Sequence, residues 1–474
     1  MTCRNDLRDL HLNEDHSCLQ DDRWRCGAPQ AESHTMNAPH AALPPDDPQR
    51  VELHDEVHAR PPGRVRLPAL VLYVAVLHDG VTSREQAEHL RRLPGRPAVE
   101  DGDLAANFVR LRGAGFSLRW ERHTEFTRYS LVQALPKQAM LPACEPELLE
   151  GLAVPAAWLQ SIPGRTLVAV HLVMLATDMT DPEAALDRAR HWFGDMTVVA
   201  SLMGHGHSMV VTDFRLRESG FSRMLVLAHP GTTDTRAGRV AKRLLELETY
   251  RLMALRGLPL AKQLGPPLSQ AELALADITQ RLDAKQDGDE ALLDRLVALA
   301  ANVERATAEH MYRFSATEAY AALVAQRIAE LRERAVPGTQ TIGEFMQRRL
   351  SPAIATVAAT GQRLVTLSQR IERAGALLRT RVDIATEAQS QQLLAKLTRG
   401  QELQLRLQST VEGLSIAAIS YYVISLVLYA AKAVKAAGVP LNPEIAAGAM
   451  IPLVLWGVAH LTRRLHKRLH APEA

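Results

Sequence analysis

Residues 414–431 read LSIAAISYYVISLVLYAA, and residues 445–461 read IAAGAMIPLVLWGVAHL. Neither stretch contains Asp, Glu, Lys or Arg, and each is close to the shortest length at which a helix crosses a bilayer. The connector, residues 432–444, contains Gly438 and Pro440, which end helices. Because backbone polar groups in hydrocarbon must bond within their own segment, this pattern predicts a transmembrane helical hairpin. A buried hairpin in a soluble helical bundle is the alternative.

The basic residues around the two stretches predict their orientation. Those that flank the pair on its outer sides are Lys396, Arg399, Arg406, Arg463, Arg464, Lys467 and Arg468, whereas the connector has only Lys432 and Lys435. The positive-inside rule places both ends, including a basic tail at 462–474, in the cytoplasm and the connector outside. The whole N-terminal body is then cytoplasmic.

Four polar side chains share one face of the first stretch. Ser415, Tyr422, Ser425 and Tyr429 follow one another at steps of seven, three and four, which is the spacing of a single helix face. They could line a pore in an oligomer. The alternative is ordinary contact between membrane helices, which the absence of an ionisable residue in mid-span favours.

The segment before the hairpin, residues 268–412, has the pattern of long helices. Its apolar positions recur at steps of three and four and include Leu350, Ile354, Val357, Leu364, Leu367, Ile371, Ala374 and Leu378, then Leu393, Leu397, Leu403, Leu407, Val411 and Leu414. Such heptads indicate a coiled coil or a helical bundle. An antiparallel bundle within one chain and an oligomeric stalk are both open interpretations.

Local signals divide this helical segment. Gly265-Pro266-Pro267 marks its beginning, and Ser269 with Glu272 fits a capping box. Thr341 with Glu344 fits a second one. The pair at 351–352, Ser-Pro, predicts either a kink or a new helix start, because proline is tolerated only in the first turn.

Residues 46–262 carry mainly strand signals. Residues 70–77 and 167–175 are apolar runs, and 116–121 alternate between apolar and polar side chains. Residues 208–215 and 221–228 predict a hairpin. With a predicted helix at 236–258, this segment forms a cytoplasmic α+β or α/β domain. Residues 1–45 have no such period and predict a disordered leader, with Met36 as the expected start of translation.

Composition narrows the functional classes. Lys and Arg number 55 against 53 Asp and Glu, a net charge of +2, so a dedicated nucleic-acid binder is not expected. Four Cys in 474 residues do not form a disulfide framework. No Gly-rich phosphate loop, Gly-x-Ser-x-Gly elbow, Cys-x-x-Cys pair or dinucleotide fingerprint is present. These observations favour a non-enzymatic protein that needs no cofactor.

One constellation nevertheless suggests chemistry. If residues 120–126 (WERHTEF) continue as a strand, then Glu121, His123 and Glu125 share a face. Two carboxylates around an imidazole can bind a divalent metal or act as acid and base. Ion pairs with Arg119 or Arg217 are the non-functional alternative.

A second candidate lies at His58 and Arg60 in the sequence HDEVHARPP of residues 54–62. These side chains could bind an anion. The structural alternative is a clamp that holds the N-terminal segment on the domain by hydrogen bonds.

Six stretches together resemble a bacterial family catalogued as domain of unknown function 3422. They are DEVHARPP (55–62), WERHTEF (120–126), TDFR (212–215), TIGEFMQRRL (341–350), LLRTRVD (377–383) and QLRLQSTVEGLSIAAISYY (404–422). The resemblance covers nearly everything after residue 45 and implies a membrane-anchored protein of the bacterial inner membrane with no assigned activity.

The layout is also similar in topology to CorA-type magnesium channels. That family carries Gly-Met-Asn in the external loop, which the connector lacks. Three hypotheses follow: an anchored scaffold or interaction module that self-associates through its long helices, a CorA-like oligomeric cation conduit, and a metal-binding sensor or enzyme using Glu121, His123 and Glu125. The first is preferred, with the lipid bilayer and a second copy of the chain as expected partners.

Overall fold

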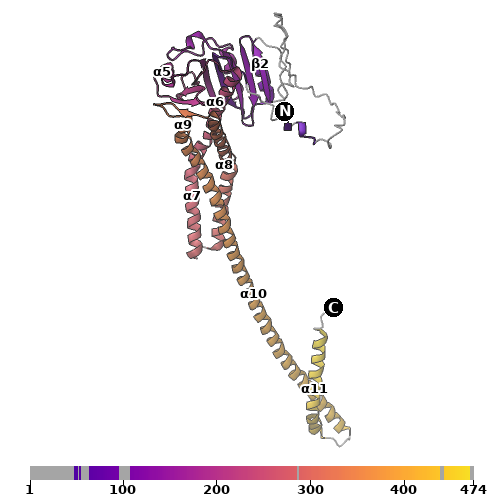
Figure 1. Cartoon of the computed structure of the whole chain (residues 1–474). Coiled ribbons are helices and arrows are strands. Elements are labelled where there is room, and N and C mark those ends of the chain that lie inside the picture. The colour runs from indigo at the N-terminus through magenta and orange to yellow at the C-terminus, as the bar shows by residue number, and fades with distance from the viewer. Residues whose placement is uncertain are drawn as a thin grey trace, which may run out of the picture. The chain divides into compact units, whose positions relative to one another are not determined.

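The computed structural model describes residues 47–51, 53–54, 63–94, 107–284, 288–437 and 442–469 (Figure 1). They divide into two compact units. The first comprises Met1–Glu272 and Asn302–Ser368, and the second comprises Leu273–Ala301 and Gln369–Ala474. The expected leader, residues 1–45, lies outside the described residues.

A nine-stranded sheet forms the centre of the first unit. Its strands are β1 (Ala69–Leu77), β2 (Phe108–Gly113), β3 (Phe116–Arg122), β4 (Phe126–Ala134), β5 (Arg165–Ala176), β6 (Val199–Met203), β7 (Ser208–Thr212), β8 (Ser222–Ala228) and β9 (Arg334–Ala335). They lie in the order β2-β3-β4-β1-β5-β8-β7-β6-β9. Among the pairs of described strands only β5 and β8 run parallel. The predicted α+β class is confirmed.

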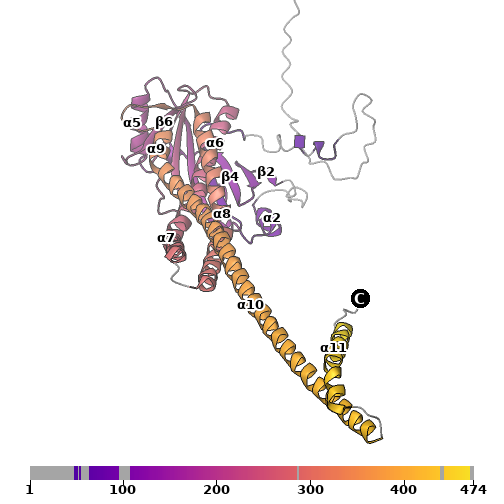
Figure 2. The same ribbon diagram turned by 90° about the horizontal axis from the view of Figure 1, so that it is seen from below.

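The two halves of the sheet repeat one order of elements, although β1 pairs with β4 antiparallel and β5 pairs with β8 parallel. Strand β1, helix α2 (Ser83–Arg91) and the meander β2-β3-β4 form one half, and β5, helix α5 (Pro182–Trp192) and the meander β6-β7-β8 form the other. The first strands of the two halves, β1 and β5, pair antiparallel at the centre. In Figure 2, α5 lies toward the end of the sheet that carries β6, and α2 lies toward the end that carries β2.

Helices cover both faces of the sheet. Alternate residues of β1 point to opposite faces, so Val71 and Tyr73 enter one apolar cluster and Leu72 and Val74 another. The first cluster is covered by helix α6 (Asp234–Leu255) and by α9 (Ile342–Arg349), whereas α2 and the short helix α4 (Ala156–Gln160) cover the second. All nine residues of β1 are therefore buried.

The predicted hairpin and several helix boundaries are confirmed. Strands β7 and β8 pair antiparallel, and Gly220 before β8 has a φ of 80°, which favours glycine. Thr341 caps α9 with both bonds of the capping box to Glu344. Ser351-Pro352 is a new start, since helix α10 (Ser351–Ala436) begins there.

The predicted break at Gly265-Pro266-Pro267 is wrong. Helix α7 (Gly257–Ala284) continues through both prolines. Ser269 accordingly lies inside this helix, where its hydroxyl donates to the carbonyl of Gly265 at 3.2 Å instead of capping a new one. The packing of Leu264 and Leu268, both buried, outweighs the local preference of proline for a helix end.

The second unit contains the end of α7, the first part of α8 (Asp289–Leu331), α10 from Gln369 onward and helix α11 (Pro443–Leu469). Arg381 of α10 pairs with Asp289 at 3.0 Å and donates to the carbonyl of Leu282 at 2.6 Å. Of the heptad residues up to Leu378, Ile354 and Ala374 are half-buried and the others are buried, whereas those from Leu393 to Leu414 are exposed. The bundle interpretation therefore holds for the first part of the heptad series only.

Candidate functional site: a buried charge network on helix α6

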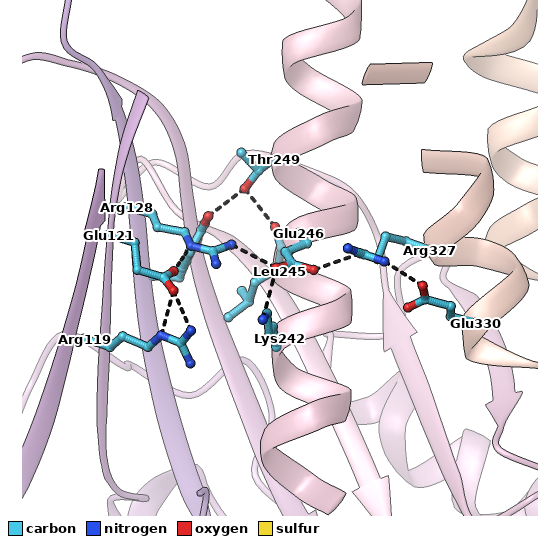
Figure 3. A network of polar contacts seen from close by, with 10 residues as sticks. Arg119, Glu121, Arg128, Lys242, Leu245, Glu246, Thr249, Arg327 and Glu330 are labelled. Carbon is cyan, nitrogen blue, oxygen red and sulfur yellow. Dashed lines mark hydrogen bonds and ion pairs between the residues drawn. The ribbon is translucent and has the colours of Figure 1, made fainter. Parts of the chain in front are cut away.

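A network of charged side chains lies between the sheet and helix α6 (Figure 3). Glu121 on β3 and Arg128 on β4 are register partners, so their side chains project from the same face of the sheet. Glu121 accepts hydrogen bonds from Arg119 and, at its other carboxylate oxygen, from Nε of Arg128. Only about 2% of the Glu121 side chain is exposed. Its charge is thus balanced by two guanidinium groups within the core.

Glu246 of helix α6 is the central anion of the network. One of its carboxylate oxygens accepts from Nη1 of Arg128 at 3.2 Å, and the other accepts from Nε of Arg327 at 2.8 Å. Lys242, one helical turn earlier, places its Nζ 3.9 Å from Oε1 of Glu246. Arg327 comes from α8 and also donates to Glu330 at 2.7 Å. Glu246 therefore joins the sheet, α6 and α8 in one chain of charged contacts.

Two hydrogen-bonded hydroxyl groups, of Tyr73 and Thr249, lie about one turn further along α6. Thr249 donates its hydroxyl to the carbonyl of Leu245 at 2.8 Å, so the hydroxyl of Tyr73, at 2.7 Å, donates to Thr249. Burial raises the pKa of Tyr73 to about 12. Burial lowers the pKa of Lys242, because it disfavours the charged ammonium. The negative charge of Glu246 opposes that shift, and the positive charge of Arg119 adds to it. Tyr73 is therefore a neutral donor at physiological pH.

The chemistry of these groups is structural. Guanidinium groups keep their protons in proteins, so the pairs with Glu121 and Glu246 are fixed donors and acceptors and cannot relay protons. Breaking such a pair leaves a buried charge without its partner, which is strongly destabilising. The network therefore holds β3, β4, α6 and α8 in one specific arrangement.

The structure separates the three residues of the predicted metal site. Strand β3 ends at Arg122 and β4 begins at Phe126, so His123 and Glu125 lie in the turn and not on a continuous strand with Glu121. The ion pair between Glu121 and Arg119, the alternative use of that carboxylate, is present at 2.5 Å. Arg217 pairs with Asp213 and Glu145 instead.

Glu125 is bound by two arginines. Arg313 of α8 donates to its carboxylate, and Arg256, which follows α6, lies 4.0 Å away. His123 stacks on Phe126 with ring centroids 4.6 Å apart. Within the described ranges, no group of three or more His, Cys, Asp or Glu side chains is arranged to hold a metal ion. The metal site stays a prediction without geometric support.

The other predicted site residues fall in different places. His58 and Arg60 lie outside the described residues. The four polar residues of the apolar segment are on α10, where Ser415 and Ser425 donate to the carbonyls of Val411 and Tyr421 at 2.8 and 2.9 Å. Tyr422 and Tyr429 are exposed.

Two of the stretches that carried the family resemblance meet in the first unit. Phe214 of the TDFR stretch has a φ of 52°, a conformation that bulky residues rarely adopt. Its ring stacks on Phe345 of the TIGEFMQRRL stretch, with centroids 4.6 Å apart, and Arg251 lies 5.3 Å above it. Asp213 fixes the loop by pairing with Arg217 at 2.8 Å. These contacts hold a strained backbone between the sheet and α9.

Sequence reasoning did not find Glu246 or Arg327. Lys242 and Glu246 are four residues apart on a helix, a spacing typical of exposed surface pairs. Leu244, Leu245 and Leu247 surround Glu246 in sequence. An acidic residue within so apolar a run was the available signal.

Comparison with known proteins identifies a family. Residues 45–469 match a family model described as "Protein of unknown function (DUF3422)". No curated protein and no solved structure matches the chain. The match extends over the sheet, the charge network and all the long helices. The chain belongs to the DUF3422 family.

Proposed function

We propose that this protein is anchored in the bacterial inner membrane by the apolar parts of α10 and α11, with the α+β unit on the cytoplasmic side as a self-associating interaction module. The observation that carries the proposal is exposed apolar surface. The most apolar 18-residue window in Ile342–Ala436 has a mean hydropathy of 1.9, that in Pro443–Thr462 has 1.7, and only 6% of each window is buried. A core helix of a soluble protein is mostly buried, so these windows need another apolar environment.

The side chains of these windows suit hydrocarbon. Leu414, Leu426, Leu453 and Leu461 are each 61–73% exposed. In water they would form a large apolar surface, which monomeric soluble proteins rarely show. In a bilayer the same side chains contact lipid tails. Trp456, 69% exposed, adds an aromatic residue to this surface.

Hydroxyl groups in the first window are also compatible with a membrane. Ser415 and Ser425 donate to carbonyls four residues earlier in their own helix. Such bonds satisfy the hydroxyl without water. The basic residues before 414 and after 461 support the cytoplasmic placement of both ends.

Self-association is supported by a second exposed apolar surface, on the part of α10 before residue 414. Leu393, Leu397, Leu403 and Leu407 are 58–68% exposed. Arg399, Glu402 and Arg406 occur among them, so this surface lies in water and not in lipid. An apolar stripe on a solvated helix is typical of a surface that binds another helix. We therefore assign to the long helices the role of holding copies of the α+β unit together.

Extraction of membranes with alkaline carbonate tests the anchor. Wild-type chain is expected in the pellet. The double substitution of Ile419→Arg and Leu426→Arg places two charges within one span, at about 2.5–3.5 kcal/mol each near its centre, and should move most of the protein to the supernatant.

The matched control is Leu377→Arg with Ile384→Arg. These residues are on the same helix and are 68% and 65% exposed, but they precede the apolar window. This variant should stay in the pellet. Wild-type protein in the supernatant, or equal release of both double variants, would contradict the anchor.

A further inference from the structure

Helix α10 carries a regular stripe between residues 393 and 414. Positions that alternate at steps of four and three are Leu393, Leu397, Gly400, Gln404, Leu407, Val411 and Leu414. All seven are exposed, the leucines and the valine by 58–73%. Steps of 3.5 residues on average keep one seam facing a partner helix over six successive turns.

Neighbouring helices within the second unit leave this stripe open. Arg381 of α10 binds Asp289 at the start of α8 and the carbonyl of Leu282 near the end of α7, and it precedes the stripe. Helix α11 has 27 residues. As an antiparallel neighbour of α10 it reaches back only to about residue 410, given equal rise per residue in both helices. Residues 393–407 thus lie between the two intrachain partners.

We propose that two copies of the chain pair through this stripe as a parallel, in-register, two-stranded coiled coil. The orientation rests on the proposed membrane anchor. Because α10 enters the membrane from the same side in every copy, two neighbouring α10 helices run in the same direction. Their residues at 414 lie at the same depth, which aligns identical positions of the two copies.

The residues of the stripe fit the contact positions of such a pair. Leu393, Gly400, Leu407 and Leu414 take the d positions, and Leu397, Gln404 and Val411 take the a positions. Leucine at d is typical of two-stranded parallel coils. Gln404 is the one polar residue at an a position, and its side chain finds a hydrogen-bonding partner only opposite its own counterpart. It therefore opposes antiparallel and shifted pairs.

Gly400 is the position where the two backbones come closest. A Cβ added to Gly400 would meet no atom within 4 Å in the single chain, so nothing within the described chain requires glycine there. In the dimer the missing side chain lets the helices approach closely one turn before Gln404. This approach shortens the distance that the two Gln404 side chains have to span.

The surface is large enough for an anchored dimer. Leu394 and Leu403, 62% and 58% exposed, flank the seam and widen it. With the five apolar contact residues, each copy offers seven side chains of on the order of 70 Å² each. Two copies then bury roughly 1,000 Å², the lower bound for a specific interface. Confinement to one membrane raises the effective concentration of the partner.

Cysteine crosslinking in native membranes tests the pairing. In full-length chain with its four natural cysteines replaced by serine, Leu407→Cys faces its counterpart across the seam, whereas Ser409→Cys points away from it. Under mild oxidation we expect at least fivefold more covalent dimer from Leu407→Cys than from Ser409→Cys. Equal yields would overturn the proposal.

A mixed experiment tests the direction of the pair. Two tagged chains are expressed together, one with Leu393→Cys and the other with Val411→Cys. These positions meet in an antiparallel coil and are about 27 Å apart in the parallel one. Their crosslink should stay at the Ser409→Cys level. A mixed yield as high as that of Leu407→Cys would overturn the parallel arrangement.

A failure of the coiled-coil interface can be distinguished from a failure of the proposed function. Carbonate extraction of the same membranes reports the anchor independently, and light scattering of detergent-solubilised protein reports the mass of the assembly. An anchored oligomer without the Leu407→Cys crosslink would leave the proposed function standing and refute this interface. A chain released by carbonate would refute the anchor itself.

Discussion

Replacing Glu246 with Gln tests whether the charge network holds the first unit together. The substitution keeps the shape of the side chain and removes its charge, while the side chains of Glu246 and Arg128 are each only 6% exposed. Two charge-assisted hydrogen bonds are affected, from Arg128 at 3.2 Å and Arg327 at 2.8 Å. Bonds of this kind contribute about 1.5–3 kcal/mol each.

The expected loss of unfolding free energy is about 3 kcal/mol, the lower end of what breaking a buried pair costs. Arg128 keeps Glu121, and Arg327 keeps Glu330, as second partners, which limits the loss. For a unit of this size 1 kcal/mol corresponds to roughly 2–4 °C in Tm. Thermal unfolding of detergent-solubilised chain, followed by tryptophan fluorescence, should therefore show a Tm lower by about 6–12 °C.

The control for this experiment is Glu330→Gln. Glu330 also pairs with Arg327, at 2.7 Å, but its side chain is 30% exposed. More exposed pairs contribute about 0–1 kcal/mol, so the Tm should fall by no more than about 4 °C. If Glu246→Gln lowered the Tm no more than this control, the charge network would not hold the first unit together.

Three further changes probe other parts of the first unit, and one control change, at Gly375, lies in the second; all are measured by the same thermal unfolding. Gly238→Ala places a Cβ 1.7 Å from the carbonyl oxygen of Gly63 and should lower the Tm strongly. In the control Gly375→Ala, the added Cβ meets Leu296 at an ordinary 3.5 Å, so the Tm should be unchanged or raised. Equal changes in Tm would refute the close approach of Gly238 to Gly63. Burial lowers the pKa of His171 to about 3. The folded chain therefore keeps this imidazole neutral, and its contribution to stability is complete above about pH 6.5 and is lost as the pH falls. Between pH 7 and 5 the free energy of unfolding of the wild type should drop by about 2 kcal/mol more than that of His171→Phe, and parallel pH profiles would contradict this. Thr341→Ala removes the cap of α9 and should cost about 1 kcal/mol, with an unchanged Tm as the refuting result.

Local patterns predicted much of the architecture. The run at 70–77 predicted the buried strand β1, and the alternation at 116–121 predicted β3. The hairpin β7–β8 and the cap at Thr341 followed from turn and capping residues alone. These features depend on interactions within a few residues, so the sequence expresses them directly.

Features that depend on distant contacts were beyond such patterns. Proline 266 lies inside α7 because Leu264 and Leu268 are buried there by tertiary packing. Strand β9 has two residues and exists only through its pairing with β6. The network joins Glu246 to Arg327, 81 residues later. No spacing within a few residues predicts such a pair. The turn at 123–125 was also not predicted, and it interrupts the strand on which the metal site depended.

The most direct test of the central claim is the labelling of single cysteines in intact spheroplasts with a membrane-impermeant maleimide. Asn442, the residue before α11, belongs to the connector that the proposed topology places outside. Asn442→Cys in chain whose natural cysteines are serine should react before lysis. A chain in which Cys3, Cys18 and Cys26 are serine and Cys144, exposed in the α+β unit, is the single cysteine should react only after lysis. Labelling of Cys144 in intact spheroplasts, or of Asn442→Cys only after lysis, would contradict a hairpin anchor with a cytoplasmic body.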